Sequence, residues 1–220
     1  SLRIYGYNNV EIPSELKSSL TIAGDADKDY KRENIVSEQL VGEGFNEILN
    51  NSLTKTSYYE KNELNKYTWD KTVKVMNPLS ADLGVMRQTL LFGGLESIVR
   101  NINRKAKNLK FFEVGNCYWF NAEKHTPESP IKAYAQDYHM ALWVTGKRVE
   151  GSWAHPDEDS SFYELKAYVD NIFRRVGITR EMLVEEPSDN NIFDKALTIE
   201  NHGGKTIAEL GIVNHKILKD

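Results

Sequence analysis

The residue types that most often carry catalysis or bind metals are few in this sequence, and they are not spaced as in a working site. The five histidines lack the close helical spacing of a zinc motif such as His-Glu-x-x-His; they are His125, His139, His155, His202 and His215. His155 lies close to Asp157 and Asp159, but a short acidic stretch of this kind is more typical of a solvated loop. We therefore expect no metal site and no catalytic residue in this chain.

Two stretches have groups suited to binding phosphate. The run RNINRKAKNLK contains a cluster of polar and basic side chains, namely Arg100, Asn101, Arg104, Lys105, Lys107 and Lys110. These side chains could contact RNA phosphate or an acidic partner, although cations are also common at a solvated helix end, and we favour the second interpretation. The stretch HGGK, residues 202–205, lacks the P-loop spacing and a following helix, so we interpret it as a hairpin turn.

Arg87 and Trp153 are further candidates for contacts. Arg87 precedes a leucine-rich helical pattern, where it could anchor a subunit interface or pair within the chain with a carboxylate such as Glu113; we favour the pair within the chain. Tryptophan can stack on nucleobases. Trp119 and Trp143 lie in predicted strands and are expected in the core, whereas Trp153 lies in a predicted loop and is the better contact candidate.

The composition limits the classes of partner. The 220 residues include 28 basic and 32 acidic side chains, a formal net charge of −4, so any RNA contact requires a local basic patch. The single cysteine, Cys117, excludes an internal disulfide and suits a reducing cytosol, and we expect a cytoplasmic location. No apolar run approaches the ~18 residues of a membrane span, and we expect no membrane partner.

The hydrophobic pattern predicts alternating helices and strands. The predicted helices share apolar positions at helical spacing and cover residues 31–44, 54–64, 89–103 and 162–176. The predicted strands cover residues 45–53, 72–78, 109–120 and 137–146, with a final hairpin around 201–204; residues 121–136 and 147–161 are predicted loops. Hairpin-like succession without regular βαβ units favours an α+β fold with a largely antiparallel sheet flanked by helices.

The predicted domain organisation has two parts. Residues 1–30 are polar and contain the charged run GDADKDYKRE; we interpret them as the tail of a preceding small module plus a linker. Residues 31–220 form the main domain, which we expect to be truncated at its C-terminal end, since no closing element follows GIVNHKILKD.

Several stretches in order resemble the β subunit of bacterial-type phenylalanyl-tRNA synthetases. The first is RIYGYNNVEIP, and the last is AELGIVNHKIL, in which the usual Leu-His-Pro is replaced by Val213-Asn214-His215. The central signature is matched by Asn77, Pro78, Leu79, Ser80, Arg87, Asn101, Arg104, Phe112, Glu113 and Gly115. A third set is matched by Gly146, Trp153, Phe162 and Lys166.

The resemblance implies the class II aminoacyl-tRNA synthetase fold and a role in a larger enzyme. That enzyme is a heterotetramer of two α and two β chains that uses ATP and magnesium to attach phenylalanine to tRNA. Its α chain carries catalysis, and its β chain carries a catalytically silent copy of the fold. The resemblance places the α-chain contact around residues 31–53 and 85–103, and an isolated chain could form a homodimer through the same surface.

The resemblance also identifies where catalytic chemistry would require an arginine. Active class II enzymes place Phe-Arg-x-Glu on a strand, so that the guanidinium neutralises the ATP α-phosphate. Alignment on Glu113 puts Phe111 of KFFE in the arginine position, and a phenyl ring has no N–H donors for phosphate. Losing one such donor costs about 10²–10³ in rate. Lys110 is adjacent, but a one-residue shift on a strand points to the other face.

Three hypotheses of function follow. We expect a silent synthetase-like domain that supports the α chain, binds no cofactor itself and contacts tRNA only through the whole enzyme. The second hypothesis is an active class II ligase that uses a different arginine, such as Arg87. The third is a free-standing RNA-binding or protein-interaction module, which the near-neutral charge disfavours for RNA.

Overall fold

The computed structural model of the chain describes residues 2–11, 24–60 and 64–219. The part of the predicted tail that falls on residues 12–23 lies outside this description. The tail begins with a short helix, α1 (Leu2–Tyr5). Helix α2 covers Asp25–Gly42, so it begins earlier than the predicted residue 31. The charged run before residue 31 was wrongly assigned to a linker because its residues carry no apolar stripe, although Asp residues favour the first turn of a helix.

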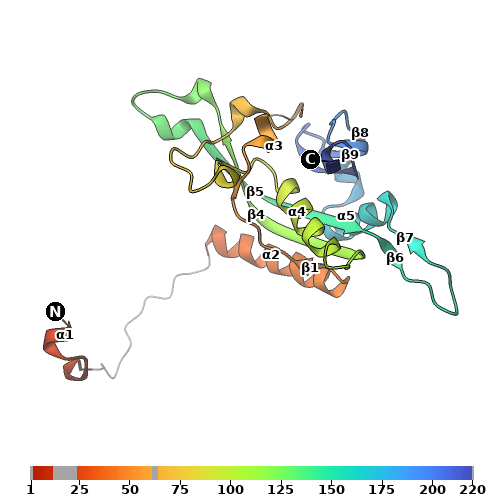
Figure 1. Cartoon of the computed structure of the whole chain (residues 1–220), viewed down its shortest axis with the longest axis horizontal. Coiled ribbons are helices and arrows are strands. Elements are labelled where there is room, and N and C mark those ends of the chain that lie inside the picture. Colours follow the sequence, from red (N-terminus) through yellow and green to blue (C-terminus); the bar gives the residue numbers. More distant parts are fainter. Residues whose placement is uncertain (1, 12–23, 61–63, 220) are drawn as a thin grey trace.

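The main sheet has the strand order β1–β4–β5 (Figure 1). The short β1 (Asn46–Glu47) runs parallel to β4 (Leu109–Phe120). The long β5 (Tyr134–Thr145) pairs antiparallel with β4 in one unbroken register, from Leu109 opposite Thr145 to Phe120 opposite Tyr134. The prediction of strand 109–120 is confirmed, and β5 begins earlier than the predicted residue 137.

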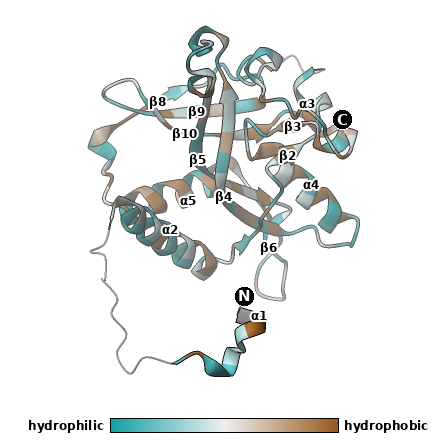
Figure 2. Cartoon of the chain, turned by 90° about the vertical axis from the view of Figure 1, so that its left-hand side faces the viewer, coloured by the Kyte–Doolittle hydropathy of each residue, from teal (hydrophilic) through white to brown (hydrophobic). Residues whose placement is uncertain are grey.

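Opposite faces of this sheet are covered by different helices, because successive side chains of β4 point to opposite sides. Phe112 packs with Val36 and Leu40 of α2, and with residues of α5 (Phe162–Arg175). In Figure 2 most of α2 is coloured as hydrophilic, which agrees with Val36 and Leu40 being its buried apolar residues. The other face, with Phe111, lies against the chain leading into α4 (Leu91–Ile102).

A second sheet, with the order β10–β9–β8, is antiparallel throughout. Its strands are β8 (Leu183–Pro187), β9 (Phe193–Asn201) and β10 (Thr206–Val213). It packs on α5 through a cluster that includes Phe173, Ile199 and Leu210. The predicted final hairpin is confirmed: Asn201 Oδ1 accepts hydrogen bonds from the backbone N–H groups of Gly203 and Lys205, so HGGK is a turn stabilised from within. Strand β8 was not predicted.

The segments between these elements account for the remaining differences from the sequence prediction. The predicted strand 45–53 is replaced by two short ones, β1 and β2 (Leu53–Thr54), and β2 pairs with β3 (Val85–Met86). The predicted strand 72–78 was wrong, because this segment forms only an isolated bridge from Lys74 to Val85. Helix α3 (Ser57–Glu60) begins later than the predicted helix 54–64, and residues 61–63 of that prediction lie outside the described residues. The predicted loop 147–161 contains a hairpin of β6 (Lys147–Val149) and β7 (Glu158–Asp159).

Across the part of the chain that the structure describes, no helix combines the length and the apolar character needed to cross a membrane.

Candidate functional site

A buried ion pair lies between β4 and the segment that leads into α4. Arg87 Nη1 is 2.5 Å from Glu113 Oε1, and the two side chains are 6% and 0% exposed. Arg87 also donates from Nε to the backbone oxygen of Asn116 at 3.0 Å. Asn50 donates to both carboxylate oxygens of Glu113, from its backbone N–H at 3.2 Å and from Nδ2 at 2.7 Å. The prediction that Arg87 pairs with Glu113 within the chain is therefore confirmed.

The backbone holds Arg87 in this position from two sides. Its N–H donates to the carbonyl of Ser52 at 2.9 Å, and its carbonyl accepts from the N–H of Tyr118 on β4 at 2.9 Å. Helix α4 contributes one more hydrogen bond, in which Ser97 Oγ donates to Asn50 Oδ1 at 2.9 Å. We call Asn50, Arg87, Ser97 and Glu113 the buried network. It ties α4, β4 and the β1–β2 segment together, and Arg87 has almost no surface left for contact with a partner.

The space around the buried network is filled. A Cβ added at Gly115 would lie 2.3 Å from Arg87 Nη2, and one added at Gly94 would lie 2.1 Å from Trp143 Cε2. Phe111, 6% exposed, packs in a cluster with Trp143 and Cys117. Burial also raises the pKa of the Cys117 thiol to about 11, so this thiol is protonated and unreactive. This face of the sheet is a packed core.

Lys110 lies on the opposite face, as expected for a shift of one residue along a strand. Its Nζ donates to Tyr168 Oη on α5 and lies 3.3 Å from Glu164 Oε1. Burial alone would lower the pKa of Lys110, but the hydrogen bonds to Tyr168 and Glu164 outweigh it and raise that pKa. The lysine therefore cannot replace the arginine missing at position 111.

The polar and basic residues predicted as RNA or partner contacts lie in two settings. Asn101 is partly buried, and its Nδ2 donates to the Ser97 carbonyl one turn earlier in α4 at 2.8 Å. The basic members of the cluster are exposed at and after the end of α4: Arg100, Arg104, Lys105 and Lys107. Their contacts with RNA or with a partner stay a prediction.

The exposure of Trp119, Trp143 and Trp153 follows the elements in which they were predicted. Trp143 is 6% exposed and lies in the core, as expected. Trp119 is partly buried beside that cluster. Trp153 is 99% exposed, so it has its whole ring available to a partner.

Two polar contributors to this region could not be recognised from the sequence. Asn50 and Ser97 lie 47 residues apart in segments that look unremarkable as sequence. A third polar residue, Gln88, is 1% exposed and donates from Nε2 to Thr72 Oγ1 at 2.6 Å. The adjacent polar pair Arg87-Gln88 lies between apolar stretches, which is a sequence sign of a buried polar site, but the prediction used it for Arg87 alone.

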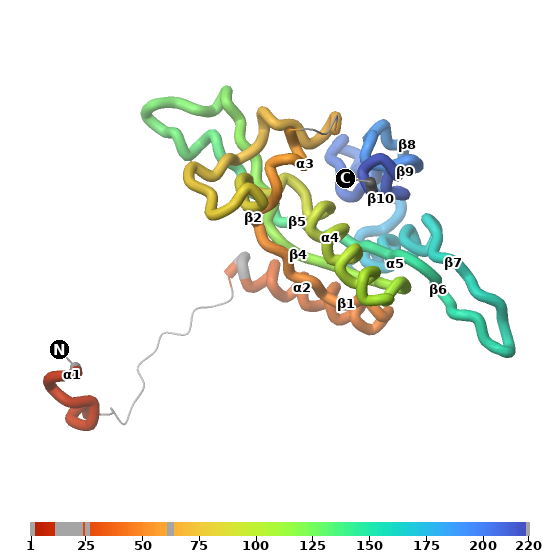
Figure 3. Tube along the Cα trace, viewed as in Figure 1, coloured from red at the N-terminus to blue at the C-terminus, as the bar shows by residue number. Residues whose placement is uncertain are grey.

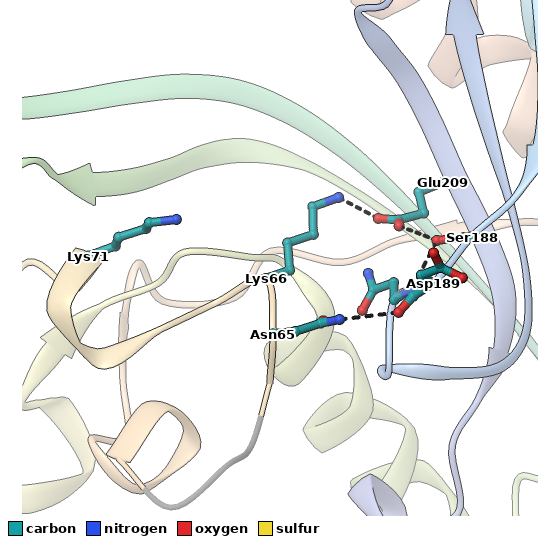
Figure 4. Close-up of a pocket in the computed structure, with 7 residues that line it drawn as sticks. Asn65, Lys66, Lys71, Ser188, Asp189 and Glu209 are labelled. Atoms are coloured by element: carbon teal, nitrogen blue, oxygen red, sulfur yellow. Dashed lines mark hydrogen bonds and ion pairs between the residues drawn. The ribbon is translucent and has the colours of Figure 1, made fainter.

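A polar hollow of about 410 Å³ lies between residues 65–71 and the second sheet (Figure 4). Lys66 Nζ is 2.5 Å from Glu209 Oε2, and Ser188 Oγ donates to Glu209 Oε1 at 2.8 Å. Burial would raise the pKa of Glu209, but the hydrogen bonds from Lys66 and Ser188 outweigh it and hold that pKa below its usual value. Asn65 Nδ2 donates to the carbonyl of Asp189 at 3.1 Å. These contacts connect two parts of the fold.

The described residues contain no candidate metal site. Among residues 2–11, 24–60 and 64–219, no group of three His, Cys, Asp or Glu side chains is arranged to hold a metal ion.

Comparison with solved structures shows which fold the chain has. A pyrrolysyl-tRNA synthetase from Desulfitobacterium hafniense, PylSc, superposes with a TM-score of 0.59 at 14% identity, over 87% of this chain and 60% of that one. A second structure of the pyrrolysyl-tRNA synthetase of this organism gives a TM-score of 0.53, over 82% and 56%. The chain therefore has a synthetase-like fold that mixes helices and sheets.

Sequence comparison defines the family. The family model described as the phenylalanyl tRNA synthetase beta chain CLM domain matches residues 12–220, and the chain belongs to this family, as its motifs predicted. The phenylalanine–tRNA ligase β subunit of Bacteroides fragilis is 60% identical over 218 residues, and that of Porphyromonas gingivalis is 46% identical. Each match covers 99% of this chain and 26% of the relative, so the chain spans about a quarter of the length of these relatives.

Proposed function

We propose that this chain is a class II synthetase-like domain of a phenylalanine–tRNA ligase β chain that performs no aminoacylation chemistry itself. Its function is to support the α chain, which would carry out the ATP- and magnesium-dependent attachment of phenylalanine to tRNA in the cytoplasm. In this proposal tRNA contact belongs to the whole enzyme, and this domain binds no cofactor.

The observation that carries the proposal is the filling of the sheet face with Phe111 and Glu113. An adenylate-forming site needs open space for ATP and a guanidinium whose donors face the α-phosphate. Here Phe111 is packed against Trp143, and Glu113 is fully buried against Arg87. The chain's own side chains thus take the place that a substrate would require.

The same contacts count against an active ligase that uses Arg87. Its Nη1 donates to Glu113 and also lies 3.4 Å from the carbonyl of Asn50, while its Nε donates to Asn116. Freeing this guanidinium for phosphate would leave Glu113 as an uncompensated buried charge, which is costly.

Apolar residues that stay exposed support the proposed α-chain contact. They fall within the two ranges 31–53 and 85–103, and they are Val41 at 58% exposure, Leu49 at 88%, Val99 at 54% and Ile102 at 41%. Burying apolar surface of this kind is the main favourable contribution to stable association. The buried network beneath α4 would keep Val99 and Ile102 on a rigid platform.

Phenylalanine-dependent ATP–pyrophosphate exchange tests the proposal. We expect no exchange with the chain alone. Addition of the chain to the matching α chain is expected to raise exchange above the level of the α chain alone, because the α chain gains its support. The variant Ile102→Asp should abolish this rise, whereas Leu79→Asp, at a 96% exposed site outside the proposed surface, should not. Exchange by the chain alone would overturn the silent-domain proposal.

A further inference from the structure

The hairpin of β6 and β7, residues 147–159, forms an arm that extends away from the sheets and helices (Figures 1 and 3). Ser160 N–H donates to the carbonyl of Gly146 at 2.9 Å, and Lys147 N–H donates to Asn108 Oδ1 at 2.8 Å. These two bonds fix the base of the arm to the rest of the chain.

The arm is held in shape along its length. Two ion pairs cross it, one between Lys147 and Asp157 and the other between Arg148 Nη2 and Glu158 Oε2 at 3.0 Å. At the tip, Ser152 N–H donates to the carbonyl of His155 at 2.9 Å. The arm therefore presents its tip in a defined conformation, and little ordering entropy remains to be lost on binding.

Trp153 lies within this tip turn and is 99% exposed. A tryptophan side chain can bury up to about 250 Å², and here none of that area is used for folding. Large aromatic side chains on a preorganised support are the typical anchors of protein interfaces. The arrangement favours the insertion of this one ring into a pocket on another molecule.

The charge of the arm identifies the chemistry of that molecule. Within residues 147–159 there are four acidic residues, Glu150, Asp157, Glu158 and Asp159, against two basic ones, Lys147 and Arg148, which leaves an excess of two negative charges. An acidic support repels the phosphates of a nucleic acid, so base stacking by Trp153 is disfavoured. A protein pocket with basic residues at its rim has the complementary charge.

We propose that residues 147–159 are a docking arm, with Trp153 as its anchor in an apolar, basic-rimmed pocket of a partner protein. The identity of that partner as the α chain rests on the proposed function. The arm is separate from the exposed apolar residues at 41, 49, 99 and 102, so it adds a second point of attachment.

Binding of the matching α chain to the 220-residue chain, measured by calorimetric titration, tests the arm. Removing an interface anchor typically costs at least ~2 kcal/mol, so Trp153→Ala is expected to weaken the Kd by about 30-fold or more. The matched control is Leu79→Ala, which removes another fully exposed apolar side chain and should leave the Kd unchanged. Added salt should weaken the wild-type complex, because the arm is acidic. Tryptophan emission should shift to the blue on binding, and Trp153→Phe should remove the shift.

The outcomes separate the arm from the proposed function. Tight binding by wild type and an equal Kd for Trp153→Ala would overturn the docking arm and leave the proposed function standing. Failure of the wild-type chain to bind the α chain would overturn both. A loss of tRNA retention in Trp153→Ala, with unchanged α-chain binding, would identify base stacking instead. If the wild-type chain self-associates and Trp153→Ala does not, as measured by light scattering, the molecule that binds Trp153 is a second copy of this chain. That outcome would also overturn the proposal.

Discussion

The chain holds charged pairs in two contrasting settings. In the buried network, Arg87 and Glu113 are 6% and 0% exposed. On the arm, Arg148 and Glu158 are both 52% exposed. The residue types are similar, but the surroundings differ in dielectric and in access to water, which decides how much each pair contributes to stability.

The two settings give the two regions different roles. A buried pair cannot lose one member without leaving a charge in a low-dielectric site, so it fixes the local arrangement of α4 and β4. The exposed pairs stiffen the arm without contributing much to folding. The Lys66–Glu209 contact is intermediate, with side chains 43% and 15% exposed. The three ion pairs differ in exposure, and substitutions can test whether their contributions to stability differ in the same order.

The largest effect is expected in the buried network. Arg87→Met or Glu113→Leu should each lower the free energy of unfolding by about 3–5 kcal/mol, because the remaining charge is buried without its partner. The double variant should cost less than the sum of the single variants, since neither charge remains. Urea unfolding followed by circular dichroism measures all three. Single variants that cost less than about 1 kcal/mol would mean that water reaches the pair.

A smaller effect is expected from crowding the packed face next to the network. Gly94→Ala would place a methyl group 2.1 Å from the indole of Trp143, and overpacking of this kind costs about 1–3 kcal/mol. Gly42→Ala is the matched control in another helix, where nothing lies within 4 Å of the added carbon; a gain of up to about 1 kcal/mol is expected there. Equal thermal stabilities for the two variants would contradict the packing argument.

The contribution of the Lys66–Glu209 ion pair to the free energy of unfolding should depend on pH. The pKa of Glu209 is lowered in the folded state, so its contribution is present above the unfolded value of about 4.3 and is lost as pH falls through the folded pKa. Glu209→Gln should cost about 1 kcal/mol at pH 7, after a discount for the exposed lysine. The difference from wild type should shrink between pH 5 and pH 3, as followed by urea unfolding at each pH. The control is Glu186→Gln at an exposed site, which should leave the free energy of unfolding at pH 7 within about 0.5 kcal/mol of wild type.

The sequence was sufficient to predict a helix or strand wherever that element buries apolar residues at regular spacing. Strand 109–120 and helix 162–176 were predicted to within a residue, because their alternating and helical apolar spacings match the faces that they bury. Segments 45–53 and 72–78 were assigned as strands from their apolar residues. In the structure segment 45–53 pairs only through the two-residue strands β1 and β2. Segment 72–78 is held by isolated backbone hydrogen bonds, such as Met86 N–H to the Val73 carbonyl at 2.9 Å.

In the buried network too, contacts that depend on how distant segments cross could not be predicted from the sequence. Arg87 and Glu113 could be paired from sequence because both belong to a recognisable ordered motif. Asn50 and Ser97 could not, because their roles depend on how α4 crosses the β1–β2 segment, and no local pattern specifies that crossing.

The smallest effect is expected on the arm. Arg148→Gln should change the free energy of unfolding by less than about 0.5 kcal/mol, because an exposed pair is screened by water and salt. The local consequence should be larger than the global one: the amide of Ser152, which is bonded to the His155 carbonyl, should exchange with solvent faster as the arm loosens. Hydrogen exchange read by mass spectrometry on a peptide that covers residues 147–159 measures this. A global loss as large as that of Arg87→Met would show that the arm is part of the folded core. A faster amide with unchanged global stability would leave the arm as a separately stiffened element, which is the property that a docking anchor at Trp153 requires.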